Sequence, residues 1–149
     1  MIELREVIET DLKVFYENQT DPEALAMAKF ASRDRDAHIA SWRRIQADPT
    51  CIARTVLLDG QVAGYIGSWL ADDRRLVGYW IGRDFWGRGI ATTAVRALVA
   101  DVSDRPLHAW VATSNVASAR VLEKAGFVLD SPEPVVGEDG VEESLYRLP

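Results

Sequence analysis

Cysteine and long apolar runs are both scarce in this chain. Cys51 is the single cysteine among 149 residues, so no intrachain disulfide can form and a reducing compartment is expected. The first residues, MIELREVIETD (1–11), alternate in polarity and lack the apolar stretch of a signal peptide. No apolar run approaches the roughly 20 residues that a membrane-spanning helix needs. We therefore expect a cytoplasmic protein without a membrane partner.

Positive charge is also in short supply. The chain carries 17 Lys and Arg against 23 Asp and Glu, a formal net charge of −6. Proteins that bind nucleic acid present a basic face to the phosphates, so no nucleic-acid partner is expected. An acidic surface instead attracts a cationic partner such as an amine. Repeats, low-complexity segments and linkers are absent too, so residues 1–149 are expected to form a single domain.

The apolar residues that are present follow the periodicities of an α+β domain. Alternating polarity and two hairpin signals, Asp59-Gly60 and Asp139-Gly140, predict strands, whereas 3.6-residue spacing predicts helices. The expected strands are 2–8, two runs within 51–70, 76–82, 107–112 and a final pair beginning at Phe127; the expected helices are 10–18, 22–30, 34–47, 88–101 and 115–125. This order predicts a mixed, mostly antiparallel central sheet flanked by helices.

Capping residues mark the ends of two of these helices. Thr10 and Asn115 stand where the N-cap of a helix is expected, and Gly126 stands at the C′ position of the last helix. One apolar stripe runs along helix 88–101, which predicts the face that packs on the sheet. Its members are Ala91, Ala94, Val95, Leu98 and Val102.

The stretch FWGRGIAT (85–92) places two glycines between a strand and a helix. Glycine lets the backbone approach a ligand closely, and the first turn of a helix offers unpaired N–H groups to an anion. A nucleotide P-loop is excluded, because the Gly-Lys-Ser/Thr ending is missing. A dinucleotide-binding fold does not fit the preceding meander of strands. A coenzyme A site and a turn that only allows tight packing both stay open for Gly87 and Gly89.

A second motif, NVASARVLEKAGF (115–127), follows the next strand. Together with GYWIGRDFWGRGIAT (78–92), it resembles the GNAT superfamily of acetyl-CoA-dependent N-acetyltransferases, and in particular the branch with the ribosomal-protein N-terminal acetyltransferases. The resemblance implies the GNAT fold, acetyl-CoA as the cofactor, and a primary amine as the acceptor. That amine would be a protein N-terminal α-amine or a small-molecule amine.

The resemblance also assigns cofactor-binding residues. The pyrophosphate loop of the family falls on WGRGIA (86–91), so backbone N–H groups would hold the pyrophosphate. The strand before the loop would pair with the pantetheine arm, and it would splay from strand 107–112 to admit the thioester. Independently of the family, Arg74, Arg75, Arg83 and Arg88 are expected to cluster around this loop, where cations suit a polyanion. Arg88 lies inside the loop and is the expected side-chain partner of a phosphate; for Arg74 and Arg75 the alternative is a solvated surface position. The assigned residues are Tyr79, Trp80, Ile81, Gly87, Arg88, Gly89, Ile90, Ala91, Thr92 and Asn115.

The acid that the family implies is Ser118. Many relatives carry a tyrosine in the helix after the asparagine, and Leu122 occupies that position here. Ser118 stands three residues after Asn115, where related enzymes carry a serine near the thiol. The alternative is that its hydroxyl completes the cap of the helix.

The general base is not evident. Glutamates of the family correspond to Leu76 and Trp110, and Thr93 also stands where this branch often has a glutamate. His108 shares a strand face with Trp110 and is the candidate base. The alternatives are a packed, hydrogen-bonded histidine and a water relay. Cys51 is expected to be a small buried residue, not a nucleophile.

Three functions therefore compete. The first is an amine N-acetyltransferase, and weak base chemistry favours an α-amine (pKa about 8) over a lysine side chain (about 10.4). The second is a non-catalytic acyl-CoA-binding or regulatory domain, and the third is an interaction module whose glycine loop is only a turn. No metal site is expected. The exposed edges of the C-terminal strands offer a surface for a homodimer.

Overall fold

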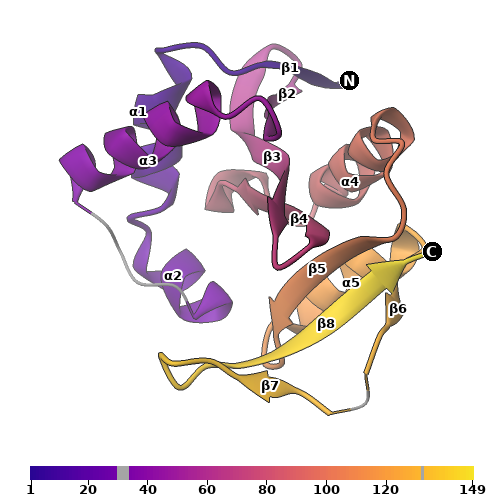
Figure 1. Cartoon of the computed structure of the whole chain (residues 1–149). Helices are drawn as coiled ribbons and strands as arrows, with labels where there is room; N and C mark the ends of the chain where they lie inside the picture. The colour runs from indigo at the N-terminus through magenta and orange to yellow at the C-terminus, as the bar shows by residue number, and fades with distance from the viewer. Residues whose placement is uncertain (30–33, 132) are drawn as a thin grey trace.

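One eight-stranded sheet organises the computed structural model, which describes residues 1–29, 34–131 and 133–149 (Figure 1). The strands run in the order β1-β2-β3-β4-β5-β8-β6, with β7 also paired to β8. They are β1 Ile2–Glu6, β2 Ile52–Leu58, β3 Gln61–Ala71, β4 Arg74–Ile81, β5 Leu107–Ala112, β6 Val128–Leu129, β7 Val135–Val136 and β8 Glu142–Leu148. The pair β4–β5 is parallel and the other described pairs are antiparallel, which confirms the predicted sheet.

Helices cover both faces of this sheet. They are α1 Asp11–Asn18, α2 Pro22–Ala28, α3 Arg35–Ala47, α4 Ile90–Asp101 and α5 Val116–Lys124, with a 3₁₀ turn at Arg83–Phe85. The helices α4 and α5 lie away from α1–α3 (Figure 1). The element order agrees with the prediction, although β1 ends at Glu6, short of residue 8. The end predicted for the second helix, residue 30, lies outside the described residues.

Two hairpin turns fix the register of the central strands. Asp59 and Gly60 join β2 to β3 with φ values of 49° and 83°, and Asp72 and Asp73 join β3 to β4 with φ values of 51° and 62°. Positive φ at both central residues is what a type I′ turn requires, and its twist matches that of the strands. The predicted turn at Asp59-Gly60 is confirmed.

The main core lies between the sheet and α4–α5. Ala94, Val95 and Leu98 of α4 are at most 1% exposed, which confirms the predicted apolar stripe. They pack with residues of β4 and β5 that alternate along each strand, namely Val77, Ile81, Leu107, Ala109 and Val111. On the opposite face α1 and α3 supply a smaller cluster of Leu12, Phe15 and Trp42. The intervening residues of β4 therefore face the side of the sheet that α1–α3 occupy.

The last helix is capped as predicted. The side-chain oxygen of Asn115 accepts a hydrogen bond from the Ser118 N–H at 3.2 Å. After the helix, Gly126 has φ 98°, and the N–H groups of Gly126 and Phe127 donate to Glu123 and Leu122 at 3.0 Å each. This is the Schellman arrangement, which fixes the end of α5 through a left-handed residue.

The predicted cap of α1 is wrong. Thr10 occupies the N-cap position, but its backbone is helical and its side chain makes no capping hydrogen bond. The buried carboxylate of Asp11 accepts the Ile8 N–H at 2.9 Å instead, together with Arg5 at 2.7 and 3.0 Å and the Thr55 hydroxyl at 2.6 Å. One carboxylate thus ties α1 to both β1 and β2, which replaces the cap.

The C-terminal part of the sheet has three strands where two were predicted. The hairpin at Asp139-Gly140 joins β7 to β8 as expected, but β6 forms a further short strand on the same edge of β8. Four apolar side chains on β6 and β7 are each about half exposed: Val128, Leu129, Val135 and Val136. This edge stays the predicted surface for a homodimer. Within the described part of the chain, no helix has the length and apolar character needed to cross a bilayer.

Candidate active site

The strands β4 and β5 separate partway along their length. Their parallel pairing comprises Arg75 with Leu107 and Leu76 with His108, at the beginning of both strands. Beyond Leu76, β4 continues to Ile81 without a β5 partner, so the predicted divergence of residues 79–81 from strand 107–112 is present. At residues 79–81 the backbone of β4 therefore faces this gap in place of β5.

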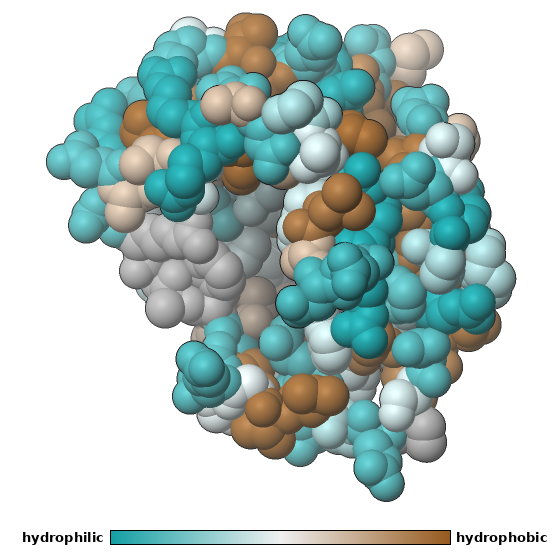
Figure 2. Space-filling view, viewed as in Figure 1, coloured by the Kyte–Doolittle hydropathy of each residue, from teal (hydrophilic) through white to brown (hydrophobic). Residues whose placement is uncertain are grey.

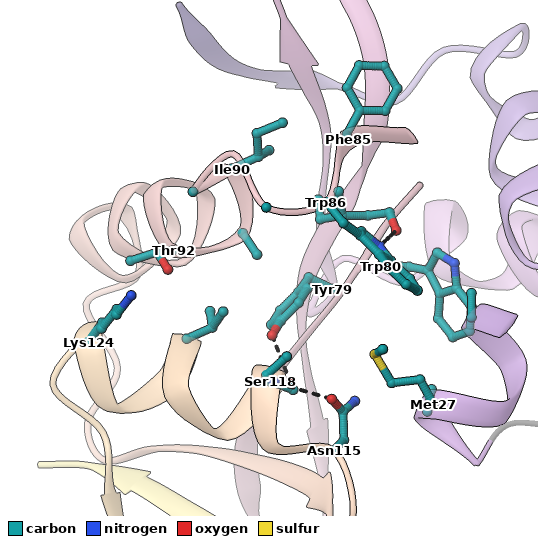
Figure 3. Close-up of a pocket in the computed structure, with 18 residues that line it drawn as sticks. Met27, Tyr79, Trp80, Phe85, Trp86, Ile90, Thr92, Asn115, Ser118 and Lys124 are labelled. Atoms are coloured by element: carbon teal, nitrogen blue, oxygen red, sulfur yellow. Dashed lines mark hydrogen bonds between the residues drawn. The ribbon is translucent and has the colours of Figure 1, made fainter. Parts of the chain in front are cut away.

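A cavity of about 430 Å³ occupies this gap (Figure 3). The molecule is hollowed at the centre of the face in Figure 2, where Figure 1 places the space between α2 and β4. Residues from α2, β4, the segment after it, α4 and α5 form the wall: Ala24, Met27, Ala28, Tyr79, Trp80, Ile81, Phe85, Trp86, Gly87, Gly89, Ile90, Ala91, Thr92, Asn115, Ala117, Ser118, Val121 and Lys124.

The cavity connects the two faces of the sheet. Tyr79 and Ile81 belong to the core formed with α4 and α5. Trp80 lies between them and points to the other face, where its indole N–H donates to the Asn18 carbonyl of α1 at 3.3 Å. Figure 3 accordingly shows the α4 side of the cavity at one end and Trp80 with Met27 of α2 at the other. We call these the loop end (residues 87–92 and Lys124) and the α2 end (Ala24, Met27, Ala28 and Trp80).

Two left-handed glycines shape the loop end. Gly87 and Gly89 have φ values of 77° and 73°, and no atom lies within 4 Å of a Cβ placed on either. Gly89 is the N-cap of α4, so the N–H groups of the first turn of that helix have no acceptor within it. The indole N–H of Trp86 donates to the Ile81 carbonyl at 2.9 Å, which fastens the loop to the end of β4. The loop and the first turn of α4 therefore offer N–H donors at an open position suited to an anion.

The predicted cluster of arginines around this loop does not form. Arg74 and Arg75 begin β4, at the end opposite the loop, and Arg75 pairs with Asp104 at 3.0 Å. Arg83 pairs with Asp21 at 3.1 Å and Glu23 at 2.6 Å. Arg88 is exposed, with its guanidinium 5.8 Å from the centre of the Phe85 ring, and does not line the cavity.

Lys124 is the cation of the loop end instead. It belongs to the last turn of α5, beside Thr92 of α4 (Figure 3). Lys124 was not among the residues predicted to bind the cofactor, because no local sequence pattern marks it. Lys124 reaches the loop end only because α5 packs against α4, which is a tertiary contact.

A hydroxyl pair stands at the middle of the cavity. The Tyr79 hydroxyl lies 2.7 Å from the Ser118 hydroxyl, so one donates to the other (Figure 3). Burial raises the pKa of the Tyr79 phenol, and the hydrogen bond to Ser118 offsets part of that rise. The cap of α5 uses the backbone N–H of Ser118, whereas its hydroxyl faces the cavity. The alternative in which the hydroxyl completes the cap is therefore not what the structure shows.

Comparison with known proteins identifies the family. The model of the acetyltransferase (GNAT) domain family matches residues 2–128. The chain belongs to this GNAT family.

Relatives of this GNAT domain include the Bacillus subtilis (strain 168) protein named "Putative ribosomal N-acetyltransferase YdaF", 33% identical over 101 residues. That alignment covers 63% of this chain and 55% of YdaF, so the chain spans about half the length of this curated relative. The aminoglycoside acetyltransferase AAC(6′)-Ib, solved in complex with coenzyme A, shares the fold at a TM-score of 0.78 and 21% identity, over 97% of this chain and 94% of that chain. The microcin C7 self-immunity acetyltransferase MccE, solved with acetyl-CoA and AMP, matches at a TM-score of 0.80 and 17% identity, over 98% and 91%.

The candidate base His108 lies outside the cavity of this GNAT domain. It pairs with Leu76 where the two strands still hydrogen bond, before they diverge. Burial lowers the pKa of His108; Asp130 opposes this shift, and Arg74 and Arg147 add to it. The structure therefore does not bring His108 together with Ser118. Leu122 is 1% exposed within the core, and the described residues that line the cavity include no aspartate, glutamate or histidine.

Cys51 also lies outside the cavity. It precedes β2, is partly buried, and does not line the cavity. Burial raises the pKa of its thiol, and Asp48 adds to the shift, so the thiolate is disfavoured. Among residues 1–29, 34–131 and 133–149, no three His, Cys, Asp or Glu side chains are grouped to hold a metal ion.

Proposed function

We propose that this GNAT domain transfers an acetyl group from acetyl-CoA to a primary amine by direct attack of the amine on the thioester. One observation carries the proposal: a cavity crosses the sheet, with an anion site at its loop end and a hydroxyl pair at its centre. A cofactor and an acceptor can enter such a cavity from opposite faces. The complex of AAC(6′)-Ib with coenzyme A shows that this fold accommodates the cofactor.

The residues present fit coenzyme A. The N–H groups of residues 87–92 would hold the pyrophosphate, and Lys124 would add a charge that a polyanion favours. Backbone groups of residues 79–81, where β4 has left β5, would hydrogen bond the amides of the pantetheine arm, as an added strand does. Asn115 lines the cavity beside Ser118 and would contact the same arm.

The hydroxyl pair would supply the proton that the leaving sulfur needs. In the reaction the amine nitrogen bonds to the carbonyl carbon, the C–S bond breaks, and the sulfur takes up a proton. The raised pKa of Tyr79 keeps its phenol protonated at neutral pH, so Tyr79 and Ser118 can act as donors in series. The amine would lose its proton to water, because none of the described lining residues carries a carboxylate or imidazole to accept it. An acceptor with a low pKa, such as an α-amine, is favoured for that reason.

The same observation supports a second candidate, a non-catalytic acyl-CoA-binding domain. Calorimetry with acetyl-CoA, followed by thiol release over a panel of amines, separates the two. Acetyl-CoA binding with amine-dependent thiol release supports the transferase. Binding without release for every amine supports the second candidate, and no binding contradicts both.

A further inference from the structure

The α2 end of the cavity is apolar on every described side. Ala24, Met27 and Ala28 come from one face of α2, and Trp80 comes from β4 (Figure 3). None of the four carries a charge at any pH. Met27 is 39% exposed, so this wall is open to an incoming molecule. A flexible thioether beside an indole adapts to flat or branched apolar groups.

Both carboxylates at the start of α2 are paired with one arginine. Arg83 forms an ion pair with Asp21 at 3.1 Å and donates a hydrogen bond to Glu23 at 2.6 Å. Both residues stand at the N-terminal end of α2, and Asp21 also caps the helix through the Glu23 N–H. A polycationic acceptor would need carboxylates for its additional ammonium groups, and at these two it would compete with Arg83.

The face of the sheet around the α2 end is also free of acidic groups along β4 and β5. After Arg74 at its start, β4 presents Leu76, Gly78 and Trp80 on this face. The strand β5 presents His108, Trp110 and Ala112. The ring of Trp69 from β3 lies over Gly78, where a Cβ would stand 2.6 Å from the ring. Trp69 and Trp110, which are 39% and 37% exposed, add indole surface to this face of the sheet.

We propose that the acceptor is a primary monoamine whose amino group is carried by an apolar, preferably aromatic, group, and that Met27 and Trp80 select it. The inference rests on the proposed function and narrows its substrate class. The apolar group would occupy the α2 end and leave the amine at the Tyr79–Ser118 pair, where the acetyl group would lie. An arylalkylamine and a peptide with an apolar first residue share this chemistry.

The test measures binding and turnover separately. Calorimetry on the protein saturated with coenzyme A gives the affinity for phenethylamine, a Phe-Ala dipeptide amide, putrescine and kanamycin. Thiol release with acetyl-CoA gives kcat/KM for the same four amines. We expect the phenethylamine or dipeptide values to exceed those of both polycations at least tenfold, and the better of the two identifies the source of the amine. Equal or better binding of a polycation would overturn the inference.

A charge introduced into the wall of the α2 end tests the subsite more directly. Met27→Asp should weaken phenethylamine binding at least tenfold and improve putrescine binding, whereas Met27→Gln, which keeps the size, should change putrescine binding little. Leu70→Asp adds the same charge on an exposed β3 residue outside the cavity and should leave both affinities unchanged. If Met27→Asp and Leu70→Asp behave alike, Met27 does not line the acceptor site.

Failure of the transferase proposal has a different signature. Phenethylamine binding that depends on Met27, with no thiol release from any amine, would support the apolar subsite and contradict the transferase reaction. Thiol release with polycations alone would support the transferase reaction and contradict the apolar subsite.

Discussion

Tyr79 and Ser118 come from elements 39 residues apart, and their 2.7 Å contact makes them one proton-donating unit. If both hydroxyls pass the same proton to the sulfur, either Tyr79→Phe or Ser118→Ala should lower kcat by about ten- to a hundredfold. The double variant should then be no slower than the slower single variant, because the two act in series. Affinity for acetyl-CoA should change little in all three, since the proton moves only in the transition state.

Steady-state rates and melting temperatures on the same preparations check this prediction. Phe retains the buried ring of Tyr79, so the fold is expected to survive. Losses that multiply in the double variant would mean two independent roles. Full activity of Ser118→Ala with a lowered melting temperature would mean that the serine only supports α5.

Lys124 and Arg88 compete as the cation that binds phosphate. Lys124 lines the loop end, whereas Arg88 points outward over Phe85. Lys124→Met should therefore weaken coenzyme A severalfold to tenfold, and less at high salt, while leaving pantetheine binding unchanged. Arg120→Met removes an exposed charge from the same helix and serves as the control. A larger loss of coenzyme A affinity in Arg88→Ala than in Lys124→Met would restore the arginine expected from the loop sequence.

At the scale of elements, the attachment of α1 depends on pH through Asp11. Burial raises the pKa of Asp11, but hydrogen bonds from Arg5, the Ile8 N–H and Thr55 outweigh it, and the pKa falls below its ordinary value. A depressed folded-state pKa means that the stabilisation is complete above the unfolded value of about 3.9 and is lost as pH falls through the folded value. Asp11→Asn should lower the free energy of unfolding at pH 7 by about 1–3 kcal/mol, because hydrogen bonds to buried groups are lost.

Urea unfolding at pH 7 and at steps below pH 4 checks the direction. The gap between the wild-type protein and Asp11→Asn should narrow only at the acid end. Glu9→Gln is the control, since Glu9 pairs with Arg43 on the exposed surface. A gap that stays constant down to acid pH would show that the Asp11 charge contributes nothing beyond its shape.

Local chemistry explains why these elements could be predicted. The turns at Asp59-Gly60 and Asp139-Gly140, the cap at Asn115 and the stop at Gly126 each depend on neighbours in the chain. The failures depend on distant partners. The side chain of Thr10 does not cap α1, because the Asp11 carboxylate accepts hydrogen bonds from Arg5 and Thr55 and holds the start of the helix. His108 shares a strand face with Trp110, yet the β4–β5 register places it where the strands still pair. The Tyr79 hydroxyl and Lys124 entered the site through the packing of α5, which no local pattern encodes.

For the molecule as a whole, binding at the loop end should appear as stability. A ligand at 100 times its dissociation constant stabilises the folded state by about 2.7 kcal/mol, and in a domain of this size each kcal/mol raises the melting temperature by about 2–4 °C. Saturating acetyl-CoA should therefore raise the melting temperature by roughly 5–10 °C.

Gly89→Val should abolish most of this rise, because a side chain would cover the N–H groups that hold the pyrophosphate. Gly60→Val is a matched control: its φ is also positive at 83°, no atom lies within 4 Å of its Cβ, and it is far from the cavity in the β2–β3 turn. Both variants should lose some intrinsic stability from the left-handed conformation, about 1–2 kcal/mol. Only Gly60→Val should keep the ligand-induced rise, and thermal scans with and without acetyl-CoA measure it directly. A rise that persists in Gly89→Val would place the cofactor elsewhere, and no rise in the wild-type protein would favour the interaction module.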